Sequence, residues 1–145
     1  MGMGERTQDA QRELWIATQD IVKTEGHPFY ARLNQVLAEH AFDAFAERRC
    51  RKFYKEDGRP GVPVGVYFRM LMVGYFEGLD SERGIAWRCA DSFALRGFLG
   101  YALTEGTPDH STLSVIRNRI DLRTHKQVFK WVVLVLAKAG LVKGK

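Results

Sequence analysis

The sequence has little cysteine, little proline and no long apolar run. Two cysteines, Cys50 and Cys89, are too few for a disulfide framework in 145 residues, which is typical of a reducing compartment. The longest uninterrupted apolar run is residues 131–137, whereas a membrane-spanning helix needs about 20 apolar residues, so we expect no contact with a membrane. The N-terminus is polar and lacks the apolar core of a signal peptide, and we therefore expect a cytoplasmic protein.

Positive charge is concentrated in the C-terminal third. The net charge of the chain is +5, yet residues 1–105 carry 14 basic and 15 acidic residues. Residues 106–145 carry eight basic residues and only two acidic ones. Such asymmetry favours a polyanionic partner near this third, and a solvated basic helix face accounts for it equally well.

Apolar residues recur at helical spacing along most of the chain, and no segment shows the alternation of a strand. We divide the chain into a polar leader, residues 1–26, and a helical domain, residues 27–145. Within the domain the pattern predicts helices over residues 28–39, 42–54, 66–78, 80–90, 92–99, 107–120 and 123–139. The third of these is apolar almost all round, as expected of a buried central helix. The fold class predicted is therefore all-α, a compact multi-helix domain.

Capping residues mark several of these helix ends. We expect Asp80 or Ser81 to begin the fourth helix. Thr107 is predicted to be the N-cap of the helix 107–120, with Pro108 at its first helical position. Gly140 is expected to end the last helix.

Groups of residues that carry catalysis are missing from the sequence. The histidines and cysteines lack the spacing of zinc ligands, and phosphate-binding and nucleophile motifs are absent. Asp109, His110 and Ser111 are adjacent, so on a helix their side chains point about 100° apart and cannot form a catalytic triad. We therefore expect no catalytic residue, no metal site and no cofactor, and no enzymatic activity of this chain by itself.

Residues 66–120 have the layout of a helix-turn-helix-like unit, and its last helix has a polar face opposite Leu113, Ile116 and Ile120. Small hydroxyl side chains let a helix approach the floor of a DNA groove, Asn pairs with adenine, and Arg pairs with guanine or phosphate. Free N–H groups at the start of this helix, near Ser111, are expected to bind a phosphate. The predicted contacts to double-stranded DNA are His110, Ser111, Thr112, Ser114, Arg117, Asn118 and Arg119, with Lys126 on the next helix.

The alternative interpretation of this helix is that its polar face is only exposed to solvent and binds nothing. If it is not the reader of DNA, the arginine-rich helix around Arg48, Arg49 and Arg51 becomes the next candidate.

Two runs of sequence carry a resemblance to a known family. Residues 58–100 contain GRPGVP, FRMLM, GLDSERGI and LRGFLG in this order, and residues 107–120 read TPDHSTLSVIRNRI. From about His27 to Lys145 the chain resembles the N-terminal domain of bacterial insertion-sequence transposases of the InsH type. The resemblance implies a helix-turn-helix domain that binds the terminal inverted repeats of a mobile element in DNA transposition and recombination, which places it on the nucleoid when bound.

In that family a ribonuclease-H-like domain follows, and its Asp-Asp-Glu triad holds divalent metal ions such as magnesium. The present sequence ends at Lys145, before the first of these aspartates is expected. The resemblance therefore implies a chain truncated before its catalytic domain, and that missing domain is an expected partner.

Two alternatives stay open. The helix 123–139 has a wide apolar face with Val128, Trp131, Val132 and Leu136, which we expect to be an exposed patch covered by the missing domain or, in a homodimer, by a second copy. In that case the chain is a helical dimerisation or interaction module. The other alternative is an inactive remnant of a truncated transposase.

Overall fold

The computed structural model describes residues 2–4, 28–56, 58 and 61–142. Its helices are α1 (Pro28–Glu39), α2 (Phe42–Cys50), α3 (Val64–Glu77), α4 (Glu82–Asp91), α5 (Phe93–Leu99), α6 (His110–Arg119) and α7 (Leu122–Lys138), with a 3-10 helix, η2 (Arg51–Phe53), after α2. No strand occurs among these described residues, and the predicted all-α class is confirmed. The predicted leader, residues 1–26, lies outside the described part except for residues 2–4.

Serine side chains cap α4 and α5. The hydroxyl of Ser81 accepts a hydrogen bond from the backbone N–H of Gly84 over 3.0 Å, and Ser92 does the same for Leu95 over 3.1 Å. Both bonds satisfy a donor that has no partner within the first turn of a helix. The predicted start at Asp80 or Ser81 is therefore confirmed at Ser81.

Two other predicted helix ends are wrong in detail. The second helix stops at Cys50 instead of residue 54, because the chain tightens there into the 3-10 turn η2. The N-cap of α6 is Asp109 and not Thr107. At the end of α7, Gly140 has the left-handed φ of 77° that stops a helix, and it follows the C-cap residue Ala139.

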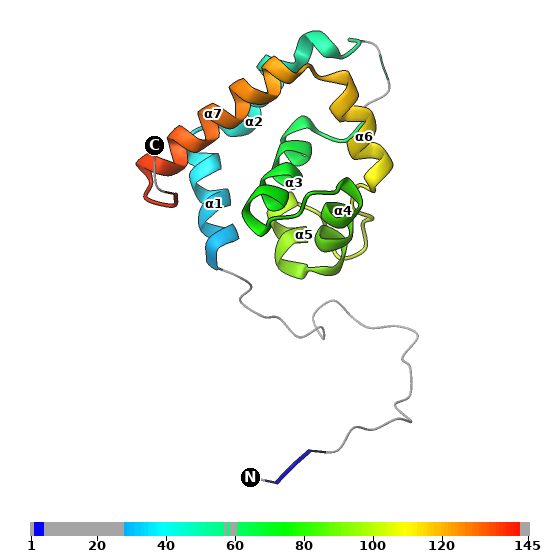
Figure 1. Cartoon of the computed structure of the whole chain (residues 1–145), viewed down its shortest axis with the longest axis vertical. Coiled ribbons are helices and arrows are strands. Elements are labelled where there is room, and N and C mark those ends of the chain that lie inside the picture. Colours follow the sequence, from blue (N-terminus) through cyan, green and yellow to red (C-terminus); the bar gives the residue numbers. More distant parts are fainter. Residues whose placement is uncertain (1, 5–27, 57, 59–60, 143–145) are drawn as a thin grey trace.

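α3 lies at the centre of the domain and packs against α2, α4 and α5 (Figure 1). Nine of its residues are buried, and one of them is charged. The guanidinium of Arg69 donates to both carboxylate oxygens of Asp43 on α2, over 2.8 and 3.1 Å, and to the amide oxygen of Asn34 on α1 over 3.0 Å. The predicted central buried helix is confirmed, and its one buried charge holds α1 and α2 in place.

α7 runs along one side of the domain and packs against α1 and α2 (Figure 1). Its apolar face closes the core, because Val128, Val132 and Leu136 are buried. Trp131 stacks on Phe45 of α2 with ring centroids 4.4 Å apart. The predicted exposed patch of these residues is therefore wrong. Although α7 is the longest described helix, neither it nor any other helix of the described part is long and apolar enough to cross a membrane.

Candidate nucleic-acid interface

α6 lies at the edge of the molecule, where it packs against α4 (Figure 1). Leu113 and Ile116 on its inner face are buried, and Ile120 just after it is buried as well. Ser111, Val115 and Asn118 are exposed on the outer face, and Ser114 is half-buried. The predicted division of this helix into an apolar and a polar face is therefore confirmed.

The start of α6 is occupied by a carboxylate of the chain itself. One oxygen of Asp109 accepts hydrogen bonds from the backbone N–H of Thr112 over 3.0 Å, from the hydroxyl of Ser111 over 3.0 Å and from the hydroxyl of Thr112 over 3.1 Å. These bonds stabilise the charged carboxylate and lower the pKa of Asp109. A negative group at this end repels phosphate, so the prediction of free N–H groups that bind a phosphate there is wrong.

Two of the predicted contact residues are tied to α4. Arg117 forms an ion pair with Glu82, with Nη2 and Oε1 3.0 Å apart, although its side chain is 58% exposed. Nε2 of His110 lies 3.3 Å from Nη2 of Arg83. Because a guanidinium only donates, this ring nitrogen is the acceptor. Both contacts hold α6 against α4, and Arg117 keeps part of its side chain accessible.

At the C-terminal end of α6, the side chain of Arg119 contacts an aromatic residue. Its guanidinium lies over the ring of Tyr54, 4.7 Å from the ring centroid, and Tyr54 follows η2 directly. The contact joins residues that are 65 positions apart in the sequence. The sequence placed Tyr54 at the end of the predicted helix 42–54 and not among the DNA contacts, because local spacing carries no signal of a partner 65 positions away.

The start of α7 adds further positive charge. Hydrogen bonds from Thr124 lower the pKa of Asp121, the N-cap of α7, and the positive charges of Lys52 and Arg123 lower it further. Lys52 of η2 and Arg123 of α7 are thus both close to Asp121. Lys126 is exposed on α7 and follows Arg123 by three positions, which places both on the same side of that helix.

A shallow groove of about 310 Å³ follows the outer face of α6. One wall is formed by Gly61 and Val62 of the connector before α3. The other wall belongs to α6 and its cap, with Asp109, Ser111, Thr112, Val115, Ile116 and Arg119. Three of the predicted contact residues, Ser111, Thr112 and Arg119, therefore line one groove. The connector wall was not predicted.

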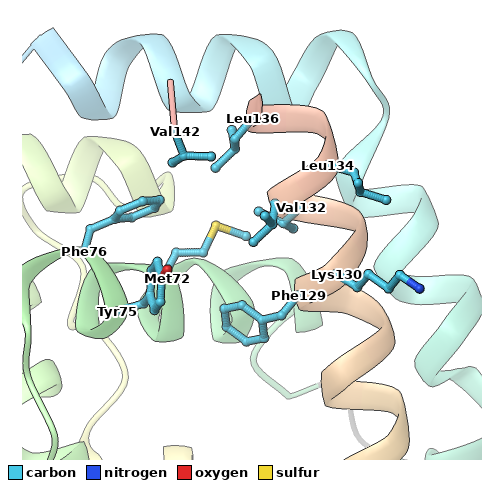
Figure 2. Close-up of a pocket in the computed structure, with 10 residues that line it drawn as sticks. Met72, Tyr75, Phe76, Phe129, Lys130, Val132, Leu134, Leu136 and Val142 are labelled. Carbon is cyan, nitrogen blue, oxygen red and sulfur yellow. The ribbon is translucent and has the colours of Figure 1, made fainter. Parts of the chain in front are cut away.

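An apolar groove of about 510 Å³ lies on another part of the surface, between α3 and α7 (Figure 2). It is lined from α3 by Met72, Tyr75 and Phe76, from α7 by Phe129, Lys130, Val132, Val133, Leu134 and Leu136, and from the C-terminal segment by Val142. Tyr75 and Leu134 are more than half exposed. This groove is an exposed apolar feature of α7. Of the predicted patch, only Val132 and Leu136 line it, and both of these side chains are buried.

Among the described residues, no group of three or more His, Cys, Asp or Glu side chains is arranged to hold a metal ion. The two cysteines are free and buried.

Comparison with known proteins gives one match. Residues 17–119 match a protein family described as a transposase domain (DUF772). This range includes helices α1 to α6 and ends at the last residue of α6, whereas α7 follows it. No curated protein and no solved structure matches the chain.

Proposed function

Since the chain belongs to the transposase domain family (DUF772), we propose that it is a DNA-binding module that recognises the terminal inverted repeats of a mobile element. The observation that carries the proposal is the outer face of α6. This helix stands at the edge of the domain with Ser111 and Asn118 exposed, while its apolar stripe anchors it to α4. Helices presented in this way enter the major groove and read base edges.

In the proposed complex the predicted residues have different roles. Ser111, Ser114 and Asn118 face the base edges, with Thr112 in the groove wall beside them. Arg119 and Lys126 contact phosphates. His110 and Arg117 act less directly, because their contacts with Arg83 and Glu82 fix the position of α6. We propose that the reader of DNA belongs to a helix-turn-helix-like unit formed by α3 to α6.

The finer family assignment is also a proposal. The motifs in residues 58–120 support an insertion-sequence transposase of the InsH type. We propose that strand cleavage, with its Asp-Asp-Glu residues and magnesium, is carried out by a separate catalytic domain. The module then acts in the cytoplasm on nucleoid DNA, and it supplies binding without a cofactor of its own.

Binding to defined duplexes tests this function. The purified chain is titrated against a duplex that carries the terminal repeat of a neighbouring element and against an unrelated duplex of equal length. We expect a footprint on the repeat only, and affinity that falls steeply with salt, because each phosphate contact releases a counterion. Equal affinity for both duplexes, or no footprint, would contradict repeat recognition. Cleavage of the duplex on addition of magnesium or manganese would contradict the assignment of catalysis to another domain.

A second candidate function is self-association through the groove between α3 and α7. Its support is the exposed apolar surface of Tyr75 and Leu134 beside that groove (Figure 2). A two-fold dimer would join this patch to its copy. Sedimentation at several salt concentrations tests the idea, since an apolar dimer tolerates salt and DNA binding does not. Leu134→Glu should abolish the dimer, whereas the matched change Leu122→Glu should not, because Leu122 is also a leucine more than half exposed on α7 but does not line the groove.

A further inference from the structure

We propose that η2 and the start of α7 form, together with Arg119, a phosphate-binding surface that holds the DNA backbone beside the base-reading face of α6. This inference rests on the proposed function and adds the residues that bind the backbone. The surface, called here the basic corner, consists of Arg51, Lys52, Arg119, Arg123 and Lys126.

Three chain segments that are distant in sequence meet at the basic corner. Figure 1 shows η2, the end of α6 and the first turns of α7 at the same end of the molecule. Arg119 lies over Tyr54, which links α6 to the segment after η2. α7 packs against α2, and η2 follows α2 directly, so η2 lies near α7. The charges of Lys52 and Arg123 accordingly both act on the carboxylate of Asp121. These links place cations from three segments on one surface.

The balance of charge at the basic corner is positive. Residues 51–56 and 119–126 together contain six basic residues and only two acidic ones, Glu56 and Asp121. The carboxylate of Asp121 is already engaged as the N-cap of α7, where it accepts from the N–H of Thr124 over 2.8 Å. The five cations that define the corner are all exposed. They are therefore available to an anion from solvent.

The N-terminal end of α6 has no such excess of positive charge. There Asp109 places a carboxylate at the start of the helix. Arg117 lies in the last turn beside Arg119, and it adds no net charge there because Glu82 pairs with it. A polyanion would therefore approach α6 with its phosphates toward the C-terminal end and away from Asp109. The neutral side chains Ser111 and Asn118 remain for base edges.

The contact of Arg119 with the ring of Tyr54 prepares it for a phosphate. A guanidinium held over an aromatic ring has already lost part of its side-chain freedom, and its N–H groups still point outward in its own plane. Those N–H groups match two phosphate oxygens, and little side-chain entropy is lost on binding. Tyr54 is in this sense a positioning residue for Arg119.

The dimensions of α6 agree with this division. Ten residues at about 1.5 Å per residue make a helix of roughly 15 Å, and the major groove is about 12 Å wide. When α6 lies in the groove as far as Asn118, Arg119 at its last position reaches the sugar-phosphate wall. The basic corner then lies against one strand of the backbone.

The test compares two double variants of equal charge loss in the full chain. Arg51→Ala with Lys52→Ala removes two cations of the basic corner, and Arg32→Ala with Lys138→Ala removes two exposed cations from α1 and the last turn of α7. Affinity is measured against salt concentration, on the repeat duplex and on unrelated duplex. We expect the first variant to lose at least tenfold in affinity on both duplexes and its salt slope to fall by about two. The control variant should change the slope by less than half a unit.

The outcomes separate this inference from the proposed function. If the unmodified chain binds no duplex, both fail. If the chain binds the repeat specifically, but both double variants keep the salt slope of the unmodified chain or lower it equally, the basic corner is overturned while the proposed function stands.

Tyr54→Leu and Tyr54→Phe test the positioning role of Tyr54. The first should lower affinity several-fold on both duplexes, and the second, which keeps the ring, should restore it; equal loss in both overturns that role. Circular dichroism establishes that each variant is folded.

Discussion

The hydroxyl of Tyr67 donates a hydrogen bond to Nε2 of His125 over 2.8 Å, and this bond joins the central helix α3 to α7. The other ring nitrogen, Nδ1, lies 2.8 Å from the backbone carbonyl oxygen of Asp121. A carbonyl oxygen only accepts, so Nδ1 carries the proton, and Nε2 of the neutral ring is the acceptor for Tyr67. Burial, with the nearby charge of Glu82, raises the pKa of Tyr67 and keeps this hydroxyl protonated.

Tyr67→Phe should lower the free energy of unfolding by about 1–2 kcal/mol, because it leaves Nε2 of His125 without its buried partner. Urea unfolding followed by circular dichroism measures the change. Tyr75→Phe is the matched control, since the ring of Tyr75 is exposed, and we expect a change near zero. Equal stability of the two variants would show that the bond contributes nothing.

Gly74 allows α3 and α4 to approach closely. A Cβ atom at this position would lie 2.6 Å from Cδ1 of Ile85 and 3.3 Å from the carbonyl oxygen of Leu79. Gly74→Ala should therefore destabilise the domain by about 1–3 kcal/mol, as overpacked cores do. Gly97→Ala serves as the control, because a Cβ there meets nothing within 4 Å and the glycine lies inside α5.

The control has the opposite expected sign. Gly97→Ala should stabilise the domain by about 0.4–1 kcal/mol, since alanine restricts the unfolded chain. Thermal unfolding of both variants distinguishes a steric clash at residue 74 from the general effect of replacing glycine by alanine. A Gly74→Ala protein as stable as the Gly97→Ala protein would contradict close packing of these helices.

The two thiols should be unreactive while the protein is folded. Burial raises the pKa of Cys50 from 9.0 to about 11 and that of Cys89 from 9.0 to about 12. At pH 7.5 a thiol-specific disulfide reagent should therefore label neither cysteine in the native protein and both in urea. Labelling of one thiol within the first minutes in native buffer would show that its helix opens readily.

The same pKa shifts predict a dependence of stability on pH. A thiol whose pKa is higher in the folded state stabilises that state fully below pH 9, and this contribution is lost as the pH rises toward 11. Between pH 8 and pH 10.5 the free energy of unfolding should fall more for the natural chain than for Cys50→Ala, by on the order of 1 kcal/mol. The tyrosines are common to both proteins, so the difference isolates the thiol.

Asn118 and Lys126 should behave differently in DNA binding. Asn118→Ala should cost about 1–3 kcal/mol on the repeat duplex and little on unrelated duplex, because it removes a contact to a base edge. Lys126→Ala should weaken both complexes about equally and reduce the salt slope by about one. Titrations on the two duplexes measure both effects. An unchanged ratio of affinities in Asn118→Ala would exclude α6 as the reader and favour the helix with Arg48 and Arg49.

The local pattern of the sequence was enough to predict the helical class and the buried and exposed faces of α6. Apolar spacing is a local property, so Leu113 and Ile116 predicted which face of α6 is buried, and the spacing along residues 66–78 predicted the central helix. The motifs of residues 58–120 likewise pointed to the transposase family that residues 17–119 match.

Other features could not be predicted from local pattern, because each depends on partners that are distant in sequence or on a choice between neighbouring residues. Thr107 and Asp109 are both able to cap a helix. In the folded chain Asp109 is the N-cap of α6, and one of its carboxylate oxygens accepts three hydrogen bonds. The apolar face of α7 is buried because α1 and α2 pack against it, with Trp131 stacked on Phe45, and no pattern within α7 encodes these neighbours. For the same reason the meeting of Arg119 with Tyr54 becomes visible only once the chain has folded.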